Sequence, residues 1–162
     1  IVGHRGNEYW VIDGQHRLLA AKRRSDITHL PCVVFETSGI KQEAKAFLAA
    51  NAGRKPVSAI GKYKALIACG DTAAIVVHKT LESLSITVKQ HAEYKNEIKA
   101  IAWALRKANE NQEKFETVMM VAAELCVDMP IQERLLDGLW YIDQFLPCGI
   151  TDKKLLERMK KI

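Results

Sequence analysis

The chain has 162 residues, of which 48% are hydrophobic and 27% are charged. These values are typical of a globular protein with one well-buried core. Because no apolar run reaches the length of a membrane span and no secretory signal opens the chain, we expect a cytoplasmic protein that does not enter the membrane. The four cysteines are far apart and form no Cys-x-x-Cys pair, which indicates reduced thiols rather than a metal site or a disulfide framework.

The positive charge is concentrated in the N-terminal half. Residues 1–70 contain 11 lysines and arginines and 5 carboxylates, a net charge of +6, whereas residues 71–162 have a net charge of −1. A basic excess of this kind favours polyanions such as nucleotides or nucleic acid. The alternative is that surface lysines only keep the domain soluble.

The chain begins with a predicted hairpin. Residues 1–3 and 8–13 are its strands, and Gly6-Asn7 supplies the turn. The run 9–12 is apolar without alternation, which indicates a strand covered on both faces. Because the sequence opens inside a strand, we expect further residues to precede it.

A short helix and a second strand follow the hairpin. Residues 14–24 read as a helix with Leu18, Leu19 and Ala21 directed inward, and 30–36 read as a buried strand. The residues between this strand and strand 8–13 are enough for a helical crossover, so we expect those two strands to pair in parallel.

The remainder is predicted to be helical. Gly53 should end one helix, Ser58 should begin the next together with Pro56, and Gly70-Asp71 should form a turn. The fold class is therefore α+β: a domain of residues 1–75 with a mixed sheet, followed by an all-helical extension of residues 76–162. The predicted helices are 40–53, 56–69, 72–84, 94–108, 111–126, 131–145 and 151–161.

Aromatic residues of the C-terminal half are predicted to pack between helices. Trp103, Trp140, Tyr141 and Phe145 lie in apolar helical patterns, which favours packing over base stacking.

The junction between strand 8–13 and its helix carries the sequence Asp13-Gly14-Gln15-His16-Arg17. Exposed amides at the start of a helix attract anions, Gly14 lets a ligand approach the backbone, and Arg17 can grip a phosphate. His16 can carry a proton near neutral pH. Asp13 has three candidate roles, which are to hold a metal, to orient a ribose or to cap the helix. A plain turn between strand and helix is the alternative to a phosphate site.

The same residues resemble the ParB/sulfiredoxin superfamily, whose members have a strand, a G-x-x-R-x-x-A segment and a helix at this position. The matching residues are Gly14, Arg17 and Ala20. Sulfiredoxins place their redox cysteine just after the glycine, where this chain has Gln15. The resemblance therefore points to the ParB-related nucleases, ATPases and free-serine kinases, and it implies their small mixed sheet with helices over about residues 1–70.

A second segment strengthens the resemblance. ParB proteins carry a Glu-Asn-x-x-Arg motif that touches nucleotide phosphates, and here Asn51 and Arg54 match it while Ala50 replaces the glutamate. Family members use that glutamate near the metal. The resemblance thus implies a nucleotide site in which binding without efficient turnover is one outcome.

Two functions follow from these residues. The first is a ParB-like protein of a phage or plasmid that binds ATP or CTP, with Mg²⁺, and acts with DNA through the basic N-terminal half. Gly14, Gln15, His16, Arg17, Asn51 and Arg54 would bind the nucleotide. As an NTPase or DNA nuclease it would use Asp13 on the metal side and His16 for proton transfer. The second is a non-catalytic DNA- or protein-binding regulator that keeps the fold. Neither the oligomeric state nor the preferred base follows from the sequence.

Overall fold

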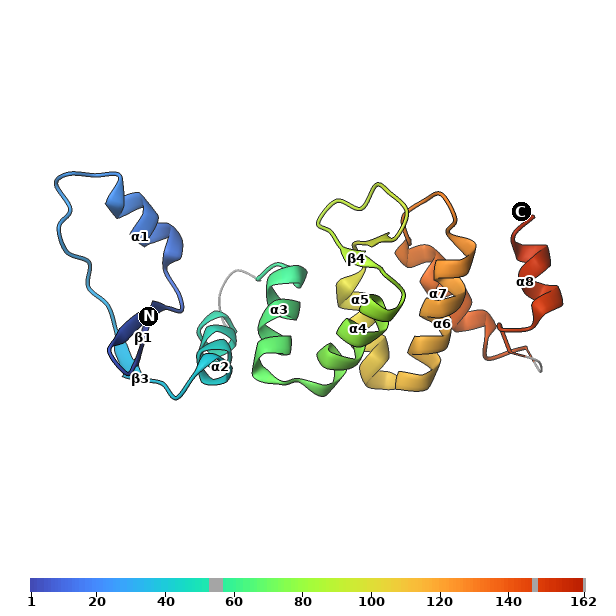
Figure 1. Cartoon of the computed structure of the whole chain (residues 1–162), viewed down its shortest axis with the longest axis horizontal. Coiled ribbons are helices and arrows are strands. Elements are labelled where there is room, and N and C mark those ends of the chain that lie inside the picture. The colour runs from blue at the N-terminus through green and yellow to red at the C-terminus, as the bar shows by residue number, and fades with distance from the viewer. Residues whose placement is uncertain (53–56, 147–148, 162) are drawn as a thin grey trace. The chain divides into compact units, whose positions relative to one another are not determined.

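The computed structural model describes residues 1–52, 57–146 and 149–161 (Figure 1). The chain divides into two compact units, Ile1–Gly70 and Asp71–Ile162. The first contains a three-stranded sheet and helices, and the second is mainly helical, in agreement with the predicted α+β class. None of the helices in the described part of the chain combines the length and the apolar character that crossing a bilayer requires.

The sheet of the first unit has β1 (Val2–Arg5) at its centre. β2 (Glu8–Val11) pairs with β1 in antiparallel orientation, with His4 opposite Tyr9, and Gly6 takes a positive φ of 61° in the turn between them. This confirms the predicted hairpin. β3 (Val34–Glu36) lies on the other side of β1 and runs parallel to it.

Two expectations about these strands are wrong. β3 pairs in parallel with β1 and has no pairing with β2, because β1 occupies the middle of the sheet. The runs expected to be buried are largely exposed, with Tyr9 at 66% and Val33 at 69%. Both outer strands are edges of a small sheet, so an apolar run here does not mean that both faces are covered.

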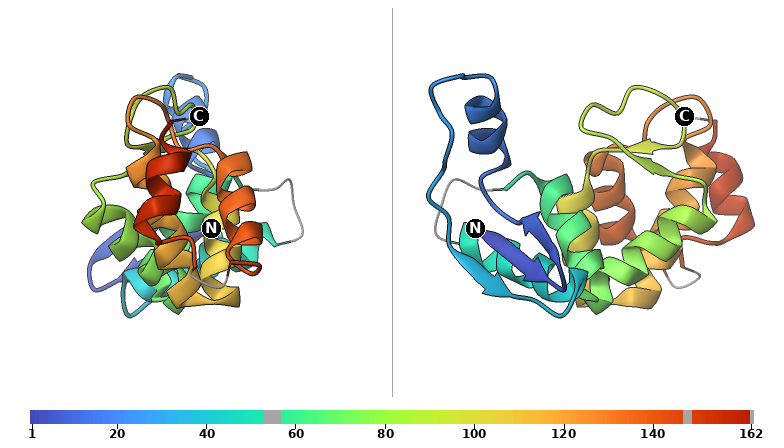
Figure 2. Two further views of the ribbon diagram at one scale, coloured as in Figure 1. Left: turned by 90° about the vertical axis from the view of Figure 1, so that its right-hand side faces the viewer. Right: turned by 60° about the vertical axis from the view of Figure 1, so that its left-hand side comes forward.

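A helix follows each of the two outer strands of this sheet, one after β2 and one after β3. α1 (Gln15–Lys22) follows β2 and stands away from the strands together with the segment that returns to β3 (Figures 1 and 2). Ala21 is its buried residue, whereas Leu19 is exposed, contrary to prediction. α2 (Ile40–Asn51) packs against α3 (Ala59–Cys69).

Local chemistry sets the ends of α3. The hydroxyl oxygen of Ser58 accepts a hydrogen bond from Gly61 N–H at 3.1 Å, as its predicted capping role requires. Gly70 ends the helix in the left-handed conformation with φ 81°, where a glycine is favoured. The predicted roles of Gly53 and Pro56 fall on positions outside the described residues.

Gly3 brings the sheet close to its neighbours in the first unit. A Cβ atom at this position would lie 2.9 Å from Cγ2 of Thr37 and 3.0 Å from Cδ1 of Ile12, and 3.5 Å from Cγ of Glu43 on α2. Any larger residue would force these groups apart. The absence of a side chain at Gly3 therefore positions Thr37 and α2 beside the strand.

The second unit is built around α6 (Gln112–Leu125), which packs against four other helices. These are α4 (Thr72–Ser83), α5 (Ile101–Glu110), α7 (Glu133–Ile142) and α8 (Lys153–Met159). The largest fully buried side chains of the chain's described part belong to this unit, among them Trp103, Phe115, Met119, Leu136 and Leu139.

Three expectations for this unit need correction. The segment predicted as a helix from residue 94 instead contributes β5 (Glu97–Ile98), which pairs in parallel with β4 (Thr87–Val88), and helix α5 begins only at Ile101. The extension is therefore not all-helical. Trp103 is buried as expected, but Tyr141 and Phe145 are exposed and contact each other at a ring distance of 5.0 Å.

Candidate functional site

At the junction between β2 and α1, the first amides of the helix donate to no partner among the described residues. Gly14 has φ 97° and ψ 18°, a left-handed conformation that a residue with a side chain resists. The first backbone bond of the helix runs from Leu18 N–H to Gly14 C=O at 3.0 Å, and no side chain caps α1. The amides of Gln15, His16 and Arg17 thus lie at the positive, open end of the helix.

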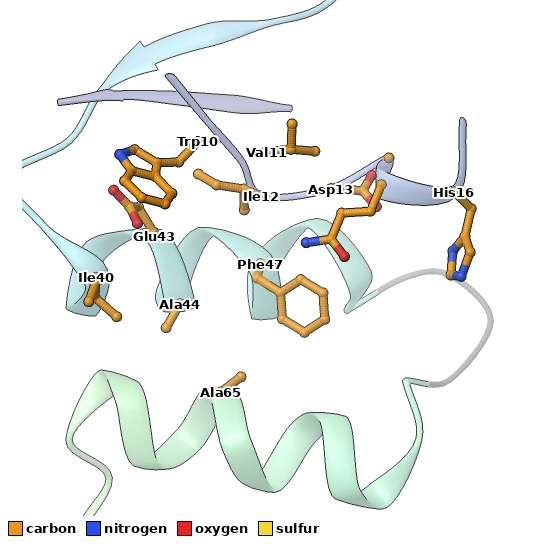
Figure 3. A pocket seen from close by; sticks show the side chains of 12 residues that line it. Trp10, Val11, Ile12, Asp13, His16, Ile40, Glu43, Ala44, Phe47 and Ala65 are labelled. Atoms are coloured by element: carbon orange, nitrogen blue, oxygen red, sulfur yellow. The ribbon is translucent and has the colours of Figure 1, made fainter. Parts of the chain in front are cut away.

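This junction borders a cavity of about 480 Å³ within the first unit (Figure 3). The β2–α1 segment forms one wall, α2 forms the facing wall, and Ala65 of α3 contributes from below. The aromatic rings of Trp10 and Phe47 belong to its lining. Its volume suits a small organic ligand. The residues that line it are Trp10, Val11, Ile12, Asp13, Gly14, Gln15, His16, Ile40, Glu43, Ala44, Phe47 and Ala65.

Four of the predicted site residues come together here. Asp13, Gly14, Gln15 and His16 all line this cavity. The carboxylate of Asp13 is largely buried, with 19% of its side chain exposed, whereas His16 is exposed at the cavity's edge. The cavity therefore combines helix amides, one imidazole and aromatic surface.

Arg17 is predicted to face the same ligand as Gly14, Gln15 and His16, but it does not line this cavity. Its Nη2 is 3.4 Å from Oδ2 of Asp13, and its guanidinium folds against Gly14. It lines a second cavity of about 640 Å³, which Asp13 and Gly14 also border. Because 73% of its side chain is exposed, the ion pair is weak and Arg17 can reorient.

The second predicted motif contributes less. Nδ2 of Asn51 donates to the backbone carbonyl of Phe47 at 2.8 Å, one turn earlier in α2, and Asn51 does not line the cavity. Arg54 lies outside the described residues. Phe47 instead brings α2 to the cavity wall.

Glu43 is a site residue that the sequence analysis missed. Its Oε1 accepts a hydrogen bond from the Thr37 hydroxyl at 2.8 Å and lies 3.9 Å from Nε of Arg5. Only 13% of its side chain is exposed, yet the residue lines the cavity. The contact depends on β3 pairing with β1, which no local pattern in the sequence revealed.

Metal chemistry has limited support from the side chains of the described residues, which form no group of three or more His, Cys, Asp or Glu side chains with metal-site geometry. Mg²⁺ that arrives with a nucleotide needs only one or two protein carboxylates. Asp13 borders the helix end and fits such a role.

Comparison with known proteins identifies a family. No curated protein and no solved structure matches the chain. The sequence profile of DUF6551, a family of unknown function, matches residues 1–162, and the chain therefore belongs to this family.

Proposed function

We propose that the first unit binds a nucleoside triphosphate, ATP or CTP, and that the protein acts together with DNA. One observation carries this proposal: left-handed Gly14 opens the amides of α1 onto a cavity lined by aromatic rings. Helix amides bind phosphate oxygens, and an aromatic wall accepts the faces of a base. The similarity of Gly14, Arg17 and Ala20 to the ParB motif supports the same ligand class.

Each residue at the helix end has a distinct role in this proposal. The backbone N–H groups of Gln15 and His16 bind the terminal phosphates, and the exposed guanidinium of Arg17 swings from Asp13 to a phosphate oxygen. The carboxylate of Asp13, which borders the start of α1, faces the Mg²⁺ that accompanies the triphosphate. The imidazole of His16 donates a hydrogen bond to a phosphate oxygen.

The site favours binding over rapid hydrolysis. Ala50 supplies no carboxylate where ParB proteins have a glutamate, and the Asn51 amide is already bonded to Phe47. A protein that binds without turning over its ligand would serve as a nucleotide-dependent regulator. This unites the first function with the alternative of a non-catalytic DNA-binding protein.

Two glycine substitutions test the nucleotide site. In Gly14→Ala, the new Cβ would lie 3.2 Å from Nη2 of Arg17, which can move aside, but an alanine is strained at φ 97°, and relief of this strain displaces the amides at the start of α1. Gly6→Ala imposes similar backbone strain at φ 61° with nothing within 4 Å of the new atom. Each costs about 1–2 kcal/mol of stability, but only Gly14 borders the cavity.

Isothermal titration calorimetry with ATP and CTP, each with Mg²⁺, gives the measurement. We expect the wild type and Gly6→Ala to bind equally and Gly14→Ala to bind at least about tenfold more weakly, since the loss of one charge-assisted hydrogen bond is of this size. Absence of heat from the wild type with both nucleotides would contradict the proposal. Equal binding by Gly14→Ala and the wild type would show that the start of α1 does not contribute to nucleotide binding.

A further inference from the structure

The two ends of the 480 Å³ cavity differ in the groups that they offer to a ligand. Asp13 and His16 lie toward one end, beside the start of α1, whereas Trp10, Ile40 and Glu43 gather at the other (Figure 3). Arg5 links the indole of Trp10 and the carboxylate of Glu43, because its guanidinium lies 5.1 Å from the centroid of the Trp10 ring and its Nε lies 3.9 Å from Oε1 of Glu43. An elongated ligand is thus exposed to helix amides and the Asp13–Arg17 pair at one end, and to an aromatic ring and the Glu43 carboxylate at the other.

Glu43 is held so that one carboxylate oxygen stays available. Both of its contacts, from the Thr37 hydroxyl and from Arg5, go to Oε1. Within the described part of the chain, Oε2 receives no hydrogen bond. Because the side chain is largely buried and fixed from β1, β3 and α2, this oxygen is a positioned acceptor in a low-dielectric setting.

The groups at the two ends also orient a nucleotide. Each end holds a carboxylate, but at the start of α1 the helix amides and the guanidinium of Arg17 offset the charge of Asp13, so the phosphates belong there and the base belongs beside the ring of Trp10. Arg5 covers one face of the Trp10 ring at 5.1 Å from its centroid. A base would therefore use the other face and present its edge to Glu43.

We propose that Glu43 is a specificity residue that accepts a hydrogen bond from the exocyclic amino group of the base. This inference rests on the proposed nucleotide binding. Cytosine and adenine carry such a donor, and carboxylates accept from it readily. Uracil places a carbonyl oxygen at the same position, which would face Oε2 with repulsion, and a purine without the 6-amino group leaves Oε2 desolvated and unbonded.

The test compares nucleotides that differ at this one group. The wild type is titrated with CTP against UTP, and with ATP against purine riboside triphosphate, all with Mg²⁺. We expect preferences of about tenfold or more for CTP and for ATP, as for one hydrogen bond to a charged group. This ratio is measured on the unaltered protein and does not depend on the folding of any variant.

Glu43→Gln then assigns the preference to its residue. The amide of glutamine can rotate to donate as well as accept, so the CTP to UTP ratio should fall to about one. Glu36→Gln is the matched control. Glu36 bonds to His4 at 2.7 Å, and His4 points to the opposite face of the sheet from its neighbour Arg5, which contacts Glu43. Glu36→Gln should keep the wild-type ratio.

The outcomes separate the two proposals. If no nucleotide binds the wild type, the proposed function fails and the role of Glu43 fails with it. If all four nucleotides bind equally, nucleotide binding stands and the specificity role is overturned. A uniform loss in Glu43→Gln, with the ratio unchanged, also overturns it and assigns Glu43 to the metal or to local structure.

Discussion

Trp103 is fixed in the core of the second unit through its single polar atom. Its Nε1 donates to Oδ1 of Asp137 on α7 at 2.7 Å, while its ring is fully buried against Phe115 and meets Trp140 edge to face at 5.9 Å. A buried indole N–H without an acceptor is costly. The exposed residue Asp137 therefore supplies the hydrogen-bond acceptor that the buried indole N–H of Trp103 requires.

Replacement of Asp137 should destabilise the second unit. Asp137→Ala removes the acceptor of Trp103, and we expect a loss of about 1 kcal/mol in the free energy of unfolding, because water can reach only part of this position. Asp137→Asn keeps an acceptor oxygen and should lose less than half as much. Urea unfolding followed by tryptophan fluorescence measures both, and equal stabilities of the two variants would contradict this role.

At the residue scale, part of the site was readable from the sequence. The Asp13-Gly14-Gln15-His16 run predicted an open helix start correctly, because a glycine at such a junction is itself the local signal. The pairing of Arg17 with Asp13 was missed, although an acidic residue just before a helix often interacts with a basic residue of its first turn. Glu43 could not be found, because its contact with Thr37 depends on how distant strands pair.

At the scale of elements, one carboxylate holds the turn that precedes β5 in the short sheet of the second unit. Oε2 of Glu97, in β5, accepts hydrogen bonds from the backbone N–H groups of Glu93 at 2.9 Å and Tyr94 at 3.1 Å. These bonds, supported by the charge of Lys89, lower the pKa of the Glu97 carboxyl below its ordinary value of 4.5. The ionised form is thus the one that holds the 93–97 turn.

The stabilisation by Glu97 should depend on pH. A carboxyl with a lowered pKa in the folded state stabilises that state above its ordinary pKa, and the effect is lost as the pH falls through the folded value. Glu97→Gln should therefore lower the urea midpoint near neutral pH, and the gap to the wild type should close in acid. Glu93→Gln is the control, since Glu93 contributes only its backbone N–H to this contact. The difference in urea midpoint between this variant and the wild type should not shrink in acid. A gap for Glu97→Gln that is independent of pH would contradict the assignment.

Among the helices predicted correctly, α3 and α4 have N-terminal ends that carry their own chemistry. Ser58 and Asp71 cap α3 and α4 with side-chain oxygens, and both helix starts are visible in the sequence. The segment around Tyr94 failed because its apolar spacing resembles a helix. Asn96 instead takes a positive φ of 58° and β5 pairs in parallel with β4, which are features of tertiary context.

At the scale of the whole molecule, core and charge are divided between the units. The fully buried aromatic side chains of the described residues lie in Asp71–Ile162, whereas the net charge of +6 lies in residues 1–70. Packing of large side chains thus concentrates in one unit and positive charge in the other. A phosphate backbone should be bound by the basic unit through charge rather than base reading.

The affinity for duplex DNA should fall when lysines of the basic unit are replaced, and it should not fall when lysines of the second unit are replaced. Lys62 and Lys64 are exposed on α3 of the basic unit, and Lys153 and Lys154 are exposed on α8 of the second unit. We expect the K62Q/K64Q double variant to bind more weakly and to reduce the slope of log affinity against log salt by about 2. The K153Q/K154Q variant loses the same charge and should behave as the wild type. Fluorescence anisotropy over a salt series measures this, and equal effects of the two pairs, or binding insensitive to salt, would refute it.

The alternation along β1 limits which insertions and deletions this family can tolerate. Gly3 and Arg5 point toward Thr37 and Glu43, whereas His4 points to the other face, where it stacks on Tyr9 and bonds to Glu36. Loss or gain of one codon within the strand would exchange these faces and place an imidazole where only a hydrogen atom fits. Length variation among descendants of this sequence should therefore be confined to the Gly6-Asn7 turn, where a Cβ on Gly6 meets nothing within 4 Å.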